Sequence, residues 1–247
     1  MKGFWKLTWT EFKLFLREPM AAFFTLVFPL MMLFLFGSIN GNEPRDGLGG
    51  FGVVDVMVPA YTAMIIATSG LLSLTIAVAV YREKGILRRL RATPLRPQTI
   101  LSAMVIVTFL MTALGMSFLL ISGKAAFGLR FAGNAFSVLA AFILSSLSFF
   151  ALGFVLAGVM PTARTAQIVG MVIFYPMIFL SGATLPLQVL PQAVRDFSPI
   201  LPLTHVVSLL QGLWMGEGWG EHLKEVGILV GLLVAGVAVS AKTFRWE

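Results

Sequence analysis

Six apolar runs, each about as long as a membrane-crossing helix, constrain this chain more than any other feature. They cover residues 20–39, 57–80, 98–122, 132–159, 166–183 and 226–241. A helix rises 1.5 Å per residue, so about 20 residues cross a hydrocarbon core about 30 Å thick. With 58% hydrophobic and only 12% charged residues, the 247-residue chain departs from the composition of soluble domains. We therefore predict an all-α integral membrane protein with six transmembrane helices, of which the sixth is the shortest.

The segment 1–18 precedes the first apolar run and has an amphipathic pattern. One helical stripe holds Trp5, Trp9, Phe12 and Leu16, and the neighbouring stripe holds Lys6, Thr10, Lys13 and Arg17. Tryptophan favours the depth of the lipid headgroups and lysine favours anionic lipid, so we expect an interfacial helix here. The alternative is that this segment is the solvated end of the first transmembrane helix.

The basic residues indicate the orientation in the membrane. Of the 18 Lys and Arg residues, 13 lie in 1–19, 81–97, 160–165 and 242–247. Because Lys and Arg are enriched in cytoplasmic loops, we expect a multi-pass protein of the inner (plasma) membrane with both termini in the cytoplasm. The formal charge of +7 is spread over short tracts between apolar runs, which favours the lipid bilayer as partner and argues against nucleic acid.

Several kinds of reactive chemistry are missing from the sequence. The chain has no cysteine, and its two histidines are too few for a His-rich metal site. Around Gly123-Lys124, Phe118 and Ala125 occupy positions where a phosphate-binding loop needs Gly and Ser or Thr. The apolar runs contain no Asp, Glu, Lys, Arg or His, which disfavours a proton- or sodium-coupled transporter. We therefore expect no enzyme activity, no catalytic residue, no metal and no cofactor on this chain.

Two connections between the apolar runs are unusual. The segment 184–225 contains Pro186, Pro191, Pro199 and Pro202 among apolar residues, and prolines at this density break a straight helix. Since irregular backbone exposed to lipid is costly, we expect short re-entrant helices that enter the outer leaflet and pack on the other spans. No soluble domain is evident, so we treat 1–247 as a single transmembrane domain.

The other connection, 81–97, is dense in arginine and has an amphipathic pattern. Its apolar residues at helical intervals are Ile86, Leu87 and Leu90, and its basic residues on the other side are Arg88, Arg89 and Arg91. A short helix of this kind at the cytoplasmic surface suits docking into a groove of a soluble partner. The alternative is a polybasic loop that serves only topology and anionic lipid.

The same connection resembles a stretch of the ABC-2 type exporter permeases. It matches that family at Glu83, Gly85, Leu87, Leu90, Thr93, Pro94 and Leu95. A second resemblance lies in the proline-rich connection, where the family has Ser-Gly, spaced prolines and Pro-Leu-Thr. Its matching residues are Ser181, Gly182, Pro186, Pro191, Pro199, Pro202, Thr204 and His205. The family often has an arginine soon after this motif, whereas Leu209-Leu210-Gln211-Gly212 follows here.

The resemblance implies a permease that works with separate ABC ATPase subunits and with a second copy of itself. It implies that ATP and Mg²⁺ bind to the ATPase, which docks on an ATPase-coupling element. We assign to that element the residues Glu83, Gly85, Ile86, Leu87, Leu90, Thr93 and Pro94. The cargo would be an amphipathic or lipophilic compound of the drug, lipid or glycan class. The alternative function is a non-transporting membrane anchor or assembly subunit that recruits a cytosolic partner.

His205 has two possible roles at this stage. It is a candidate for substrate contact because it lies in the outer motif. The other interpretation is a histidine that is hydrogen-bonded within the protein near the membrane surface.

Overall fold

The computed structural model describes residues 8–13, 15, 22–86, 97–187 and 190–243. Within these ranges the regular structure is helical and contains no strand. Six helical segments in this part of the chain are long and apolar enough to cross a membrane. The predicted all-α fold with six candidate transmembrane helices is therefore confirmed.

The candidate spans differ in how they are built. The first joins the π-helix η1 (Phe23–Val27) to α3 (Phe28–Asn40), and a short 3₁₀ turn, η2 (Asp46–Leu48), follows it. The second is a continuous rod made of α4 (Val53–Ala67), the π-helix η3 (Thr68–Leu74) and α5 (Thr75–Glu83). The other four are α7 (Pro97–Phe127), α8 (Ala135–Val159), α9 (Ala163–Leu180) and α12 (Leu223–Thr243).

Helix α12 is longer than the apolar run that predicted it. The run covers 226–241, whereas the helix has 21 residues and includes charged residues at both ends. Glu225 lies in its first turn and Lys242 in its last turn, where each charge complements the helix dipole. The helical hydrogen bonds continue past the point where hydropathy falls, so hydropathy alone underestimates this span.

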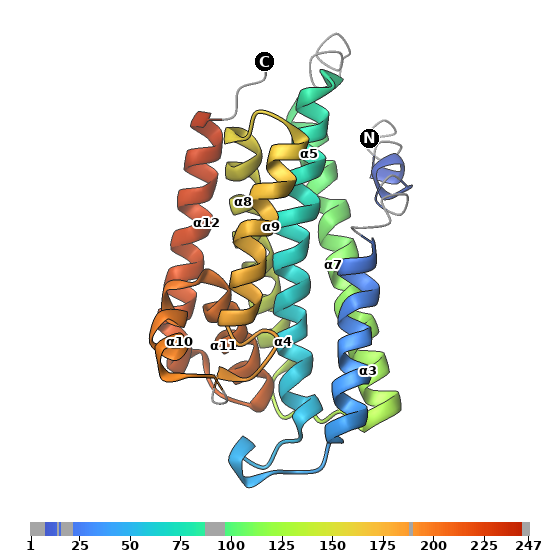
Figure 1. Ribbon diagram of the computed structural model, residues 1–247, viewed down its shortest axis with the longest axis vertical. Coiled ribbons are helices and arrows are strands. Elements are labelled where there is room, and N and C mark those ends of the chain that lie inside the picture. The colour runs from blue at the N-terminus through green and yellow to red at the C-terminus, as the bar shows by residue number, and fades with distance from the viewer. Residues whose placement is uncertain (1–7, 14, 16–21, 87–96, 188–189, 244–247) are drawn as a thin grey trace.

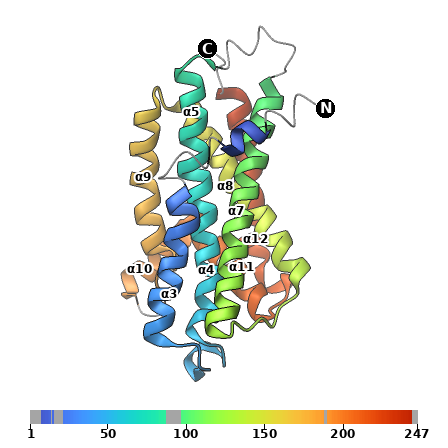
Figure 2. The same ribbon diagram turned by 90° about the vertical axis from the view of Figure 1, so that its right-hand side faces the viewer.

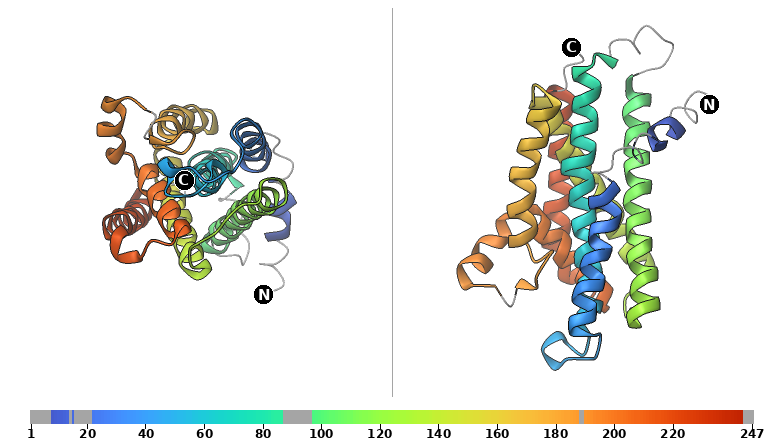
Figure 3. Two further views of the ribbon diagram at one scale, coloured as in Figure 1. Left: turned by 90° about the horizontal axis from the view of Figure 1, so that it is seen from below. Right: turned by 45° about the vertical axis from the view of Figure 1, so that its right-hand side comes forward.

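The rod of the second span forms the centre of the helical bundle (Figures 1 and 2). Every residue of α4 and η3 is buried. The apolar window of this span is 83% buried, against 11% for α12 at the edge of the bundle. The view along the bundle in Figure 3 shows the other helices around this rod. The second span is therefore the core of the protein, and the outer helices keep apolar faces for lipid or for another protein chain.

The second and fourth spans contact each other backbone to backbone. A Cβ atom on Gly153 of α8 would lie 2.2 Å from the carbonyl oxygen of Gly70 in η3, so a larger residue would push the helices apart. Thr75 Oγ1 donates to the Gly70 oxygen at 3.0 Å and lies 3.2 Å from the Gly153 oxygen. Small residues permit such close packing in membranes. This contact fixes α8 on the central rod.

The connection between the fifth and sixth spans forms short helices at the end of the bundle away from α5 (Figure 1). These are α10 (Gln192–Phe197), η5 (Ser198–Ile200), α11 (Pro202–Met215) and η6 (Trp219–His222). Most of α11 is buried, and it packs on α4 and α12. Short helices packed on the bundle thus occur where the prolines predicted them, while their insertion into the outer leaflet stays a prediction.

Residues 8–13 form a helical segment beside the α5 end of the bundle (Figure 2). Trp9 and Phe12 stack with their ring centroids 5.6 Å apart, and the Lys13 ammonium lies 5.4 Å from the Trp9 ring centroid. Trp9 is 55% exposed. Of the predicted interfacial helix, residues 1–7, 14 and 16–18, which include Trp5 and Leu16, lie outside the described residues.

Candidate functional site

The end of α5 is attached to the turn between α8 and α9 by one arginine. The two guanidinium nitrogens of Arg82 donate to three backbone carbonyls, at 2.8 Å to Ala157, 2.7 Å to Gly158 and 2.6 Å to Met160. These carbonyls belong to the last turn of α8 and the residue that follows it, where a helix leaves carbonyl groups without partners. A positive charge also suits the negative end of the helix dipole. Arg82 therefore caps α8.

The next residue caps the following helix. Glu83 Oε2 accepts a hydrogen bond of 2.7 Å from the backbone N–H of Ala163, the first residue of α9. A carboxylate at this position satisfies a free N–H group and complements the positive end of the helix dipole. We call Arg82 and Glu83 the α5 clasp, because two adjacent side chains hold both ends of the α8–α9 turn. Movement of the α5 end is thereby linked to α8 and α9.

Directly after the clasp the chain turns sharply at Gly85. Its φ is +62°, a left-handed conformation that favours glycine, and its N–H donates to the Arg82 oxygen at 3.0 Å. Ile86 is half-buried and lines a cavity of about 350 Å³. The other predicted coupling residues, Leu87, Leu90, Thr93 and Pro94, lie outside the described residues. The structure thus defines how the connection leaves α5, and the docking role of its apolar residues stays a prediction.

At the opposite end, the Ser-Gly pair of the outer motif terminates α9. Ser181 is the C-cap residue, and its hydroxyl accepts a hydrogen bond of 3.3 Å from the N–H of Ala183. Gly182 has a φ of +86°, which lets the chain reverse away from the helix axis. These two residues therefore direct the chain into the proline-rich connection.

Thr204 and His205 hold the start of α11 against the preceding turn. Thr204 Oγ1 donates to the Ser198 oxygen at 2.6 Å, and His205 Nε2 lies 2.9 Å from the Pro199 oxygen. His205 is 4% exposed. Pro202 is the first residue of α11, a position where a missing N–H costs nothing. The internally hydrogen-bonded interpretation of His205 matches this geometry.

Several outer-motif residues meet around a cavity of about 750 Å³. The predicted residues that line it are Ser181, Gly182, Pro186, Pro199, Thr204 and His205, whereas Pro191 and Pro202 do not. The cavity also contacts Gln211, whose amide nitrogen donates to the Val56 oxygen of α4 at 3.0 Å. Gln211 lies in the segment where the family that this sequence resembles often has an arginine. In this chain a neutral side chain therefore connects α11 to the central rod.

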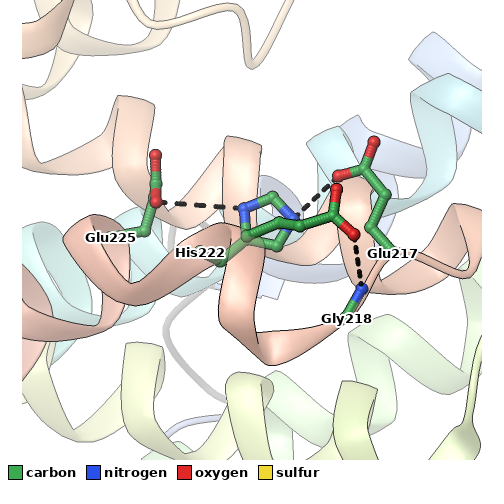
Figure 4. Close-up of polar contacts among 5 residues, drawn as sticks. Glu217, Gly218, His222 and Glu225 are labelled. Carbon is green, nitrogen blue, oxygen red and sulfur yellow. Dashed lines mark hydrogen bonds and ion pairs between the residues drawn. The ribbon is translucent and has the colours of Figure 1, made fainter.

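A histidine between two carboxylates borders the same cavity (Figure 4). His222 Nε2 lies 2.8 Å from Glu217 Oε2, and His222 Nδ1 lies 3.9 Å from Glu225 Oε2. His222 is buried, with Glu217 and Glu225 on opposite sides of its ring. The two carboxylates face different ring nitrogens, and among the described residues no cluster of three metal-ligating side chains was found. The three side chains therefore connect the turn after α11, η6 and α12 through polar contacts.

Sequence reasoning missed a buried polar cluster at this same end of the bundle. The Asp55 carboxylate accepts hydrogen bonds, each 2.8 Å long, from Asn42 Nδ2, Gly52 N and Arg130 N. Arg130 Nη2 also donates to the Asn42 oxygen at 2.7 Å. The cluster ties the α3–α4 connection to the α7–α8 connection. The sequence indicates this cluster only through the acidic residue three positions after Gly52. That spacing predicts the start of a helix, but it does not identify Asn42 or Arg130 as hydrogen-bond partners of Asp55.

A model of the ABC-2 type transporter family matches residues 2–214 of the chain. This range includes the α5 clasp and the complete outer motif.

Curated proteins with similar sequences agree with this family. The chain is similar to Nodulation protein J of Rhizobium leguminosarum bv. viciae, with 28% identity over 102 residues, 41% of this chain and 39% of that protein. It is similar to the "Probable multidrug ABC transporter permease YbhR" of Escherichia coli strain K12, with 24% identity over 161 residues, 65% of this chain and 44% of that protein. Nodulation protein J of Rhizobium meliloti strain 1021 is 30% identical over 90 residues, 36% of this chain and 33% of that protein. Each match thus spans less than half of the relative's length.

Proposed function

Because this chain belongs to the ABC-2 type transporter family, we propose that it is the membrane-spanning permease subunit of an ATP-driven ABC exporter. Its cargo is an amphipathic or lipophilic compound of the drug, lipid or glycan class, moved out of the cytoplasm or the inner leaflet. The observation that carries the proposal is the α5 clasp, which links the central rod to the α8–α9 turn immediately before the predicted docking segment. A relative named as a multidrug permease supports a drug-like cargo.

The energy for transport comes from a separate ABC ATPase, which binds ATP and Mg²⁺. The ATPase contacts Ile86, Leu87 and Leu90 of the coupling element. Glu83 and Gly85 set the geometry where the second span ends. Two copies of the permease pair with two ATPase subunits. The apolar faces that the outer helices keep exposed leave room for such a pairing. In this arrangement ATP-driven motion reaches α8 and α9 through the clasp.

In the proposed topology both termini lie in the cytoplasm at the inner membrane. Segment 1–18 lies in the membrane interface, 81–97 is the cytoplasmic coupling element, and 184–225 enters the outer leaflet, all within one domain, 1–247. The preference of Lys and Arg for the cytoplasmic side supports this orientation. The helical segment 8–13 and the last turn of α12 both lie at the α5 end of the bundle, which supports an even number of crossings between them (Figure 1).

Cysteine labelling from outside the cell tests this topology in a chain without cysteine. Cysteines at Leu187, Val194 and Leu201, all half-buried, are expected to react slowly with a membrane-impermeant thiol reagent. Glu43→Cys, in an exposed outer loop, should react quickly, and Lys84→Cys should react only after the membrane is opened. Fast labelling of the first three sites contradicts the outer-leaflet placement, and fast labelling at Lys84 reverses the orientation.

Reconstitution with the partner tests the function itself. The permease is purified together with the ABC ATPase that co-purifies with it and is placed in proteoliposomes. We expect a transported compound to stimulate ATP hydrolysis and to accumulate on the ATP-free side of the membrane. The control complex carries an ATPase variant that binds ATP but does not hydrolyse it, and it should show neither effect. A complex that forms but responds to no compound instead indicates a non-transporting membrane anchor.

A further inference from the structure

A second cavity, of about 350 Å³, lies between the N-terminal helical segment, the η3–α5 part of the central rod and α7. Three of its lining residues, Tyr81, Lys84 and Ile86, flank the α5 clasp in the chain. Its walls are mainly apolar and include Leu74 and Val80 of the rod and Met104 and Val107 of α7. A cavity of this size and lining fits a small lipophilic molecule.

One carboxylate of this cavity is buried. Glu11 is only 7% exposed, and its carboxylate accepts a hydrogen bond from the Tyr81 hydroxyl. Burial raises the pKa of the Glu11 carboxyl above its usual value, and the hydrogen bond from Tyr81 offsets part of this shift. Among the described residues Glu11 forms no salt bridge. A buried carboxylate without a cationic partner is costly, and a bound positive charge lowers that cost.

A second polar group in the cavity is a buried hydroxyl. Ser73 is 5% exposed, and its hydroxyl has no hydrogen-bond partner among the residues that the structure describes. It belongs to the π-helical turn η3, and such turns occur frequently at functional sites. A buried hydroxyl is normally hydrogen-bonded, so an unpaired one at a cavity wall indicates a place for a ligand atom.

We propose that this cavity is a binding site for lipophilic cations, with the apolar body of the ligand between the rod and α7 and its positive charge on the Glu11 carboxylate. The charge of Glu11 selects cations over anions, and the apolar walls select bulky hydrophobic groups over hydrated ions. Such a cation is either a free compound or the ammonium group of a lipid. The site lies within one copy of the chain and does not depend on the proposed ATPase or on transport.

The other charged and titratable groups at the cavity leave this selection intact. Tyr81 comes from α5, and Lys84, the C-cap residue of α5, is exposed. The part of α7 that lines the cavity is Met104, Val107 and Thr108, none of which titrates. Acidification protonates carboxylates, so it tests the charge of Glu11. Cation binding should weaken as the medium is acidified, because protonation removes the charge of Glu11.

Equilibrium dialysis of the purified chain in a non-ionic detergent tests the proposal. The probes are tetraphenylphosphonium and tetraphenylborate, which have the same shape and opposite charge. We expect saturable binding of tetraphenylphosphonium and binding of tetraphenylborate that is at least about tenfold weaker. Glu11→Gln keeps the size of the side chain and should lower the affinity for the cation about tenfold and abolish its pH dependence. The matched control Glu43→Gln removes a carboxylate from an exposed loop and should leave binding unchanged.

A second variant keeps the test decisive if Glu11→Gln does not fold. Val107→Phe fills the cavity from α7 and should abolish saturable binding of the cation. Equal binding of the two probes, or binding of the cation that neither variant weakens, overturns the proposal. Adding phosphatidylethanolamine or phosphatidylglycerol then identifies the natural source of the charge. Competition by phosphatidylethanolamine alone supports a lipid ammonium group, and the absence of competition supports a free lipophilic cation.

Discussion

The double variant Leu87→Asp, Leu90→Asp is expected to insert into the membrane normally but to lose both co-purification with the ATPase and export. Together with Ile86, the two leucines are the predicted apolar contacts of the coupling element with the ATPase. Burying aliphatic side chains at an interface supplies several kcal/mol at about 25 cal/mol per Å². A carboxylate in their place must be desolvated without a partner, which reverses the sign of that contribution. The measurement is the amount of ATPase recovered with the tagged permease, together with export in the same cells.

The matched control changes the other side of the same segment. Replacing Arg88, Arg89 and Arg91 with Gln removes three charges but leaves the leucines in place. If these residues only face anionic lipid, each contributes about 1 kcal/mol to membrane attachment and little to docking. The arginine variant should therefore retain the ATPase. The reverse order, with a docked and active double Asp variant and an inactive arginine variant, would show that 81–97 is an electrostatic anchor and not a coupling element.

Features that depend on local chemistry could be predicted from the sequence. The apolar run 132–159 predicted α8. Asn134 sets the first residue of this helix, because its side-chain oxygen accepts hydrogen bonds from the N–H groups of Phe136 and Ser137. Pro202 begins α11, and Gly182 follows the end of α9, as the properties of proline and glycine require. These residues act on their own neighbours, so a single sequence is enough to place the elements that they start and end.

Contacts between distant segments could not be predicted in the same way. Arg82 lies in the basic connection 81–97, but its carbonyl partners at the end of α8 and in the residue after it lie 75 to 78 residues later in the chain. A backbone carbonyl has no residue-specific signal, because every residue carries one. Glu11 belongs to neither stripe of the predicted amphipathic helix, and its burial depends on the packing of the N-terminal segment near Tyr81. Such contacts become visible only when the helices have been placed in space.

The clasp leads to the second large expected effect, a permease that binds its ATPase but does not transport. In Arg82→Gln, the charged hydrogen bonds to the end of α8 are lost. In Glu83→Gln, the bond to α9 loses its charge. A hydrogen bond to a charged group contributes roughly 1.5–3 kcal/mol, so the double variant should detach the α8–α9 turn from α5. Because the predicted docking leucines remain, the ATPase should still co-purify and hydrolyse ATP.

Export by the double variant should fall at least about tenfold, since a loss of about 1.4 kcal/mol already changes an equilibrium by that factor. Lys84→Gln is the matched control, because this exposed neighbour is not part of the clasp and should leave export unchanged. Arg82→Lys keeps the charge but lacks the planar fork that reaches several carbonyls at once, so its export should be intermediate. A thermal melt of each variant in detergent separates a coupling defect from unfolding. Normal export by a folded double variant would show that motion reaches α8 and α9 by another route, whereas loss of ATPase binding would make the clasp part of the docking surface.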